Sequence, residues 1–329
     1  MKKAQQPKHY FLPFLFVCLL TALLFAGCGQ KNTTYDGIDM GKSLGFPVDI
    51  MGVRYKLYSN GYAEIICVLN TYGQLTETVS YEGKDYSVVK ISWDSNGNGL
   101  FNTVYPTVAA PEHLVMPDTL IELPSYVFTN CGSSTITLPS NLKYLSIRAF
   151  DGCINIETVE FPDSLEKIAP EGLFAGCTNL KYIDLPKDIT YILNTSYMFS
   201  GCSSLESVTI PGACKILGQN TFHMCDVLSD ITLGDGLTDV YEDAFDTLPA
   251  LEEVVFPDSI TTLRDRTFCN CPNLKDVWLP DNISDVPAHM FKESLFGEDA
   301  DSSGITIHVK SSLVEYVQNL YPDATVVAK

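Results

Sequence analysis

The sequence has far fewer basic than acidic residues. It also lacks several common catalytic motifs. Its 329 residues include 21 Lys and Arg against 40 Asp and Glu, a formal net charge of −19. Nucleic-acid binding needs a basic surface, so no nucleic-acid partner is expected. The chain contains no His-Glu-x-x-His zinc motif, no phosphate-binding P-loop and no Gly-x-Gly-x-x-Gly. Its five histidines share no pattern. We therefore expect no enzyme, no catalytic residue and no cofactor.

A charged and then apolar segment at the N-terminus predicts export. Three lysines precede an apolar stretch over residues 10–25, which is too short and too broken to favour a membrane span. It ends in Leu-Phe-Ala-Gly before Cys28, which resembles a bacterial lipobox, although Phe25 stands where Leu, Val or Ile is commoner. We expect a lipoprotein signal peptide over residues 1–27 and lipidation of Cys28. The alternative is an ordinary secretory signal with an incidental cysteine.

The residues after the signal peptide predict a tether. Residues 28–52 are rich in Gly, Asn, Thr and Lys, a composition typical of flexible linkers. Acyl chains on Cys28 would hold the protein at a membrane without a spanning helix. Loss of residues 1–27 leaves 18 basic and 40 acidic residues, a charge of −22, which disfavours direct binding to anionic headgroups. We expect an extracytoplasmic, lipid-anchored protein at the cell membrane or cell surface.

The rest of the chain is an internal repeat of about 23 residues, a period typical of solenoids. An apolar residue precedes one punctuating position in each unit, at spacings of 22, 23, 24, 25, 23, 23 and 23 residues. These positions are Pro117, Pro139, Pro162, Pro186, Pro211, Gly234, Pro257 and Pro280. A phenylalanine follows each of them by 11 to 13 residues: Phe128, Phe150, Phe174, Phe199, Phe222, Phe245, Phe268 and Phe291.

The repeat predicts a solenoid with one continuous core. Alternation such as Ile183-x-Leu185 indicates a short half-buried strand, and the following proline ends it because proline has no donor for the sheet. A unit this short cannot bury its own apolar face, so neighbouring units must stack with matching side chains in ladders. We expect an α/β or mainly β, right-handed solenoid of about eight to nine repeats with a phenylalanine ladder and one parallel sheet about 40 Å long.

The repeat unit resembles the BspA-type leucine-rich repeat of bacterial surface proteins. Residues 149–153 (Ala-Phe-Asp-Gly-Cys) and 173–177 (Leu-Phe-Ala-Gly-Cys) match its Phe-x-x-Cys segment closely. The resemblance covers residues 53–329, with local departures such as Gly234 in place of proline. It implies a leucine-rich-repeat fold and adhesion to host or bacterial proteins, the latter by analogy of fold alone.

Both ends of the repeat array predict caps. Residues 53–91 contain two hairpin patterns, one with an Asn-Gly turn, and form an N-terminal β cap ahead of repeats over residues 92–309. Residues 310–329 form a C-terminal cap, in which Ser312 is expected to cap a helix. The apolar face of this helix comprises Leu313, Tyr316, Val317 and Leu320, and residues 325–327 are expected to add a last strand.

Two patterns are weak metal candidates. Six cysteines follow the ladder phenylalanines by three residues: Cys131, Cys153, Cys177, Cys202, Cys225 and Cys271. A metal or redox array is one interpretation, but without zinc-type spacing we favour small buried side chains. Asp94, Asn96 and Asn98 match the start of an EF-hand loop, although Tyr105 stands where the closing Glu is needed. We expect no metal, with this loop as a weak calcium candidate.

The outward-facing strand residues form the candidate binding face. Solenoids bind partners on such extended faces, and Tyr and Trp are frequent hot spots. The predicted residues are Glu160, Tyr182, Asp184, Asp230, Glu253, Asp276 and Trp278. We expect a protein ligand and a role in recognition or adhesion. The alternatives are a structural or assembly lipoprotein that recruits another envelope protein, and an enzyme whose site lies in the loops.

Overall fold

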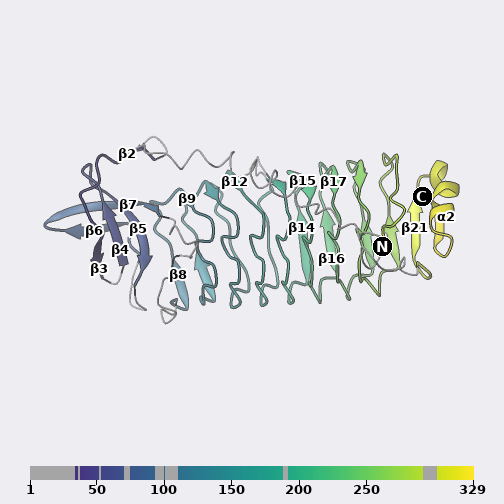
Figure 1. Ribbon diagram of the computed structural model, residues 1–329, viewed down its shortest axis with the longest axis horizontal. Helices are drawn as coiled ribbons and strands as arrows, with labels where there is room; N and C mark the ends of the chain where they lie inside the picture. The colour runs from purple at the N-terminus through teal and green to yellow at the C-terminus, as the bar shows by residue number, and fades with distance from the viewer. Residues whose placement is uncertain are drawn as a thin grey trace, which may run out of the picture.

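The computed structural model of the chain describes residues 34–35, 38–51, 53–69, 75–92, 100, 110–187, 192–291 and 302–329. Over these residues the chain forms an elongated β-solenoid, with a β-sheet cap at one end and a short helix at the other (Figure 1). The predicted signal peptide, the lipidation site Cys28 and the calcium candidates Asp94, Asn96 and Asn98 lie outside the described residues. Within the described residues, no helix is long and apolar enough to cross a membrane.

The N-terminal cap is a five-stranded sheet that follows a two-stranded hairpin. The hairpin pairs β1 (Thr34–Tyr35) with β2 (Ile38–Asp39). The sheet has the order β3-β4-β5-β7-β6, with β3 (Val48–Ile50), β4 (Val53–Leu57), β5 (Tyr62–Val68), β6 (Thr78–Tyr81) and β7 (Lys84–Ile91). β4 pairs antiparallel with β5, and β6 pairs antiparallel with β7. Both hairpins expected from the sequence are therefore present.

Strand β3 moves the start of the cap toward the N-terminus. A flexible tether was expected over residues 28–52, but Val48 pairs with Tyr55 and Ile50 pairs with Val53. Met40 is also buried, with 4% of its surface exposed. The expectation of a tether is therefore wrong for this last part of the segment. The apolar side chains of Val48 and Ile50 pack against the core, which composition alone does not reveal.

The repeats place short parallel strands in two columns, visible as two rows in Figure 1. One column precedes the punctuating prolines: β8 (His113–Val115), β10 (Thr135–Thr137), β14 (Ser207–Ile210), β16 (Asp230–Leu233), β18 (Glu253–Val255), β20 (Asp276–Trp278) and β21 (Thr306–Val309). The other follows them: β9 (Glu122–Leu123), β11 (Tyr144–Leu145), β12 (Lys167–Ile168), β13 (Ile192–Asn194), β15 (Cys214–Leu217), β17 (Asp239–Val240) and β19 (Thr262–Leu263).

The first column is not the one continuous sheet that the repeat predicts. β8 pairs with β10, β14 pairs with β16, and β18 pairs with β20 in a separate four-stranded sheet. Residues 158–160 and 182–185 occupy strand positions in the sequence pattern but are not strands in the structure. The two longest repeat spacings, 24 and 25 residues, fall at this break. Extra residues shift the backbone out of register with its neighbours, so isolated backbone bonds, such as Lys181 N–H to the Glu157 carbonyl at 3.0 Å, join these turns in place of paired strands.

The eight phenylalanines stack along the solenoid axis as expected. Consecutive rings from Phe128 to Phe291 have centroid separations of 5.1 to 6.0 Å. Each ring is buried, with at most 4% of the residue exposed. Backbone bonds join neighbouring turns beside the rings, for example Phe150 N–H to the Leu173 carbonyl at 3.0 Å. Each ring thus fills the space between two others, which fixes the turn spacing.

The C-terminal cap differs in detail from the expected helix. A 3-10 turn (η2, Ser311–Leu313) leads into α2 (Val314–Leu320), and no side chain caps α2, so the predicted Ser312 cap is wrong. Val317 is buried, but Tyr316 is 41% exposed and donates a hydrogen bond to Asp285 at 3.2 Å. β22 (Thr325–Ala328) pairs parallel with β21, which confirms the predicted last strand.

Replacement of a ladder ring tests whether this stack stabilises the solenoid. Phe199 lies between Phe174 and Phe222, with centroids 5.9 and 6.0 Å away. We expect Phe199→Ala to lower the free energy of unfolding by about 3–5 kcal/mol, because it leaves a cavity in the core. Met224→Ala, at a residue 51% exposed, is the control. Equal shifts of both variants in chemical denaturation would contradict the proposed role of the ladder.

The cap contains a buried carboxylate, Glu64, which is 2% exposed. Tyr58 donates to it at 2.6 Å, Ser92 donates to its other oxygen, and Lys90 Nζ lies 2.9 Å away. Burial acts to raise the pKa of Glu64, but the charge of Lys90 and these hydrogen bonds outweigh it and hold the pKa below 4.5, its usual value. The ionised form therefore stabilises the folded cap.

The lowered pKa of Glu64 predicts a loss of stability in acid. The stabilisation is fully present above about pH 5 and is lost as the pH falls through the lower folded-state pKa. Glu64→Gln should destabilise the protein by about 1–3 kcal/mol near neutral pH. It should also flatten the decline in melting temperature between pH 5 and about pH 3, measured by circular dichroism. A decline as steep as in the unchanged protein would show that other groups cause the acid sensitivity.

Candidate binding face

The outward side chains of the first strand column form the face that we call the strand face. Pairing aligns Glu253 with Asp276 and Val255 with Trp278 across β18 and β20. The next pairing sets His308 of β21 beside Trp278. Because side chains alternate across a strand, Val254 and Val277 point into the core while these neighbours point outward. The outward-facing positions predicted from the repeat are therefore aligned from strand to strand at this end of the solenoid.

Trp278 is the centre of a cluster on the strand face. Its indole N–H donates to Glu253 at 2.7 Å, and its ring stacks on His308 with centroids 3.6 Å apart and planes 3° apart. His308 Nε2 lies 2.8 Å from the carboxylate of Asp276. The structure therefore brings together three predicted residues, Glu253, Asp276 and Trp278, and adds His308. The column position of His308 beside Trp278 was the only sequence signal for it.

Tyr182 belongs to a second cluster on the same face. Its ring is 53% exposed, and its hydroxyl donates to Glu206 at 3.0 Å. This hydrogen bond, together with the charge of Glu206, raises the pKa of Tyr182. Lys181 forms an ion pair with Glu157 at 3.0 Å, which raises the pKa of the lysine. Glu206 was missed by the sequence analysis because it lies one position before the strand.

The two clusters are too far apart to touch one small ligand. Four turns separate the register positions of Tyr182 and Asp276, which corresponds to about 19 Å at the usual strand spacing. The remaining predicted residues, Glu160, Asp184 and Asp230, are exposed along this face. A partner that contacts both clusters must therefore be extended, as a protein surface or a polymer is.

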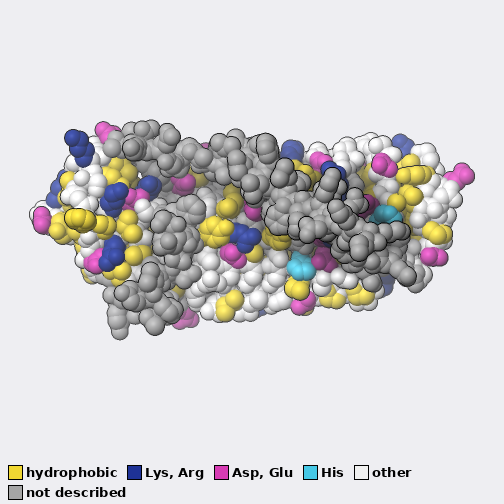
Figure 2. Space-filling model, in the orientation of Figure 1, with side chains coloured by type: hydrophobic (Ala, Val, Ile, Leu, Met, Phe, Trp, Pro, Cys, Tyr) yellow, Lys and Arg dark blue, Asp and Glu magenta, His cyan; other side chains and the backbone are white. Residues whose placement is uncertain are grey.

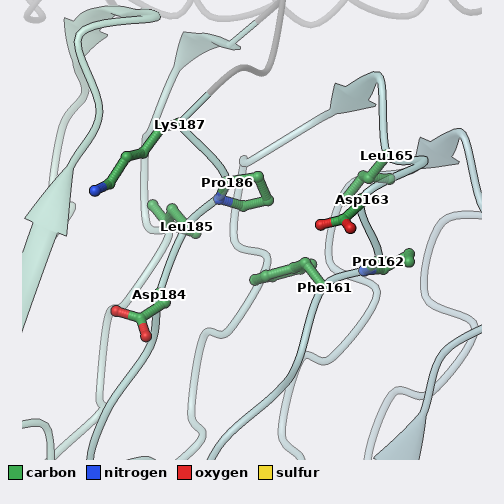
Figure 3. Close-up of a pocket in the computed structure, with 8 residues that line it drawn as sticks. All are labelled: Phe161, Pro162, Asp163, Leu165, Asp184, Leu185, Pro186 and Lys187. Atoms are coloured by element: carbon green, nitrogen blue, oxygen red, sulfur yellow. The ribbon is translucent and has the colours of Figure 1, made fainter.

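A shallow hollow lies where the strand face ends beside the prolines (Figure 3). It has a volume of about 350 Å³ and is lined by Phe161, Pro162, Asp163, Leu165, Asp184, Leu185, Pro186 and Lys187. Figure 3 shows the charged groups of Asp163, Asp184 and Lys187 around its apolar residues. The predicted face residue Asp184 is part of its wall. The hollow is large enough for one side chain of a partner.

The cysteines that follow the ladder phenylalanines by three residues pack inside the solenoid. Cys153, Cys177 and Cys202 are buried. Each thiol donates to the carbonyl of the ladder phenylalanine in the preceding repeat: to Phe128, Phe150 and Phe174 at 3.0, 3.1 and 3.1 Å. Cys225 and Cys271 make the same contact. Burial raises the pKa of the thiols, to about 12 for Cys177 and Cys271. Such thiols are poor nucleophiles at neutral pH.

Other candidate chemistry is weak in the part of the chain that the structure describes. No group of three or more His, Cys, Asp or Glu side chains there is arranged to hold a metal ion. Residues 41–45 match Gly-x-Ser-x-Gly, which the sequence analysis overlooked. The motif needs a strand-to-helix turn, but Ser43 precedes strand β3 and its hydroxyl donates to the Gly45 carbonyl at 3.3 Å. This serine is not set up as a nucleophile.

Comparison with known families identifies the repeat. The model of the BspA type leucine rich repeat region matches six copies, over residues 107–197 and 194–298. The chain belongs to the BspA-type leucine-rich-repeat family. Leucine-rich-repeat proteins of this type are typically non-enzymatic. No curated protein matches the chain.

Solved structures similar to this chain include bacterial leucine-rich-repeat proteins. A leucine-rich repeat protein from Bacteroides ovatus ATCC 8483 is 19% identical, with a TM-score of 0.59 over 86% of this chain and 77% of that one. A leucine rich cell surface protein from Faecalibacterium prausnitzii A2-165 is 20% identical, with a TM-score of 0.49 over 87% and 95% of the two chains. At 19% identity, the likeness to the Bacteroides ovatus protein shows the fold alone.

The buried thiols of this BspA-type solenoid predict slow labelling. At pH 8 the column cysteines should react with a thiol reagent about 1,000-fold more slowly than in denaturant, because burial suppresses the thiolate. Mass spectrometry of the labelled peptides would locate each site, with the partly exposed Cys67 as internal reference. Labelling of Cys177 or Cys202 at the rate of Cys67 would contradict a purely structural role and reopen the redox interpretation.

Proposed function

We propose that the protein is a lipid-anchored surface protein that recognises another protein through its strand face. The aromatic and acidic clusters around Trp278 and Tyr182 carry this proposal. Both aromatic side chains are held in place by hydrogen bonds to carboxylates, at 2.7 and 3.0 Å. Side chains that are already ordered lose less entropy on binding than mobile ones. Tyr and Trp in such positions are typical hot spots of protein interfaces.

The charge of the strand face favours a partner with basic residues. Asp230, Glu253 and Asp276 occupy the same register position on three successive strands of the column. Like charges directly opposite each other on neighbouring strands are destabilising. A lysine or arginine from a partner would relieve this repulsion as well as steer the encounter. Recognition of this kind fits adhesion to host or bacterial proteins.

The proposed location rests on the N-terminal sequence and on the family. The lipobox-like segment that ends at Cys28 is what a lipid anchor requires, and BspA-type repeats resemble those of bacterial surface proteins. The same face would equally serve an assembly lipoprotein that recruits a partner of its own envelope. Pull-down with the ectodomain, residues 29–329, separates the two roles. Host-surface proteins support adhesion, whereas envelope proteins of the producing bacterium support assembly.

Removal of the two aromatic anchors tests the strand face. We expect the double variant Trp278→Ala and Tyr182→Ala to lose capture of the partner, with its affinity reduced about 1,000-fold or more, because hot-spot side chains each contribute about 2 kcal/mol or more. Binding of the purified partner would be measured by calorimetry.

Tyr316→Ala is the matched control, since Tyr316 is 41% exposed and donates a hydrogen bond to a carboxylate as Tyr182 does, but lies on the C-terminal helix. Circular dichroism would confirm that all variants fold. Full affinity of the double variant would remove the strand face as the binding site and leave the hollow and the loops as candidates.

A further inference from the structure

Acidic residues are distributed unevenly between the cap and the solenoid. Residues 38–92 carry five Lys and Arg against six Asp and Glu, whereas residues 93–329 carry 12 against 33. Figure 2 shows Lys and Arg side chains beside hydrophobic ones at the end of the molecule that the cap forms. The net charge of the whole chain therefore does not describe the cap, which is close to neutral. Repulsion from an anionic surface acts on the solenoid and much less on this end.

The cap also exposes large apolar side chains around its edge strand β3. Phe46 is 96% exposed, Met51 77% and Leu44 54%. Leu44 and Phe46 immediately precede β3, and Met51 follows it in the turn to β4. No other eight-residue stretch of the described chain exposes three large apolar side chains. Single exposed apolar residues are ordinary on protein surfaces, but a group of them marks an interaction site.

Basic side chains accompany this apolar group. Lys42 is exposed two residues before Leu44. Arg54 on β4 extends over β3, where its guanidinium forms a two-point ion pair with Asp49 at 2.7 and 3.0 Å. Lys56 lies on the same outward side of β4, with its ammonium 5.5 Å from the ring of Tyr58. Aromatic and aliphatic side chains with flanking lysines are the composition of segments that lie in a membrane interface.

We propose that the cap docks on the surface of a phospholipid bilayer, with Leu44, Phe46 and Met51 inserted at the headgroup boundary. This inference rests on the lipid anchor of the proposed function. Phe46 is 18 residues from Cys28. The described chain is already folded at β2, whose first residue Ile38 is 10 residues from Cys28, and ten residues span at most about 35 Å. The anchor therefore keeps the cap within reach of the membrane that holds it.

Docking through the cap orients the whole molecule. The solenoid runs away from the cap (Figure 1), so its acidic residues move away from the anionic headgroups. The strand face then lies along the side of a projecting rod and stays accessible to a partner. The chain thus uses two contacts with the membrane, the acyl groups and the apolar edge of the cap, a pairing that makes membrane attachment stable.

Two tryptophan variants of the acylated full chain test the docking. Phe46→Trp places a fluorophore in the apolar group, and Val227→Trp places one on the solenoid, outside the strand face, at a residue 45% exposed. Each protein is reconstituted on vesicles of phosphatidylcholine with a minor fraction of phosphatidylglycerol, and the emission of the unchanged protein is subtracted. Lipids brominated near the headgroup end of the acyl chains should quench Phe46→Trp about threefold more than Val227→Trp, because interfacial side chains lie at that depth.

The outcomes separate docking from the rest of the proposed function. Equal quenching of the two variants on vesicles that retain the protein would overturn docking and leave the anchor intact. Failure of the protein to sediment with vesicles would overturn the anchor and docking together. Shielding of Phe46→Trp from acrylamide without vesicles, increasing with protein concentration, would show that a second copy of the chain covers the patch instead. Strand-face binding to a protein partner is measured separately and is unaffected by each result.

Discussion

The structure depends on one constraint, the stacking of the buried ladder phenylalanines from each turn to the next. With centroids 5.1 to 6.0 Å apart, the rings lie slightly farther apart than the strand spacing of about 4.8 Å, close enough to stack from turn to turn. A turn cannot move along the axis without opening a cavity at a ring and breaking backbone bonds beside it. The same spacing aligns every other repeat position into a column. The cysteine thiols, the inner strand residues and the outward face are therefore all set by the rings.

The strand face shows how this register brings charged and aromatic side chains together. Stacking sets Glu253 against Asp276, an unfavourable pairing that a less constrained sheet would avoid. Neighbouring side chains contact both carboxylates: Trp278 donates to Glu253, and His308 lies within hydrogen-bond distance of Asp276. Both rings are ordered as a result. A row of carboxylates with fixed aromatic neighbours is then available at a spacing that only an extended partner can follow.

Repetition explains what the sequence could predict and what it could not. Eight phenylalanines in one register imply a stacked core, and the outward columns follow from strand alternation at Trp278 and Glu253. Features that occur once carry no such signal. The composition around Val48 is that of a linker, yet pairing with Tyr55 makes it a strand. Ser312 has the local pattern of a helix cap, but the 3-10 turn places Leu313 at that position. The Trp278–His308 stack needs an exact cross-strand pairing over the 32-residue gap between Asp276 and His308.

The exposed surfaces of the cap and of the solenoid differ in charge and in apolar content. Residues 93–329 carry nearly three acidic residues for each basic one, which keeps a long rod soluble and disfavours contact with anionic surfaces. The cap lacks this excess and has Phe46 almost fully exposed. A rod that avoids the membrane along its length but tolerates it at one end has a preferred orientation. With the proposed anchor at the N-terminus, that orientation leaves the strand face along the side of the rod, and the excess of acidic residues there disfavours contact with an anionic membrane.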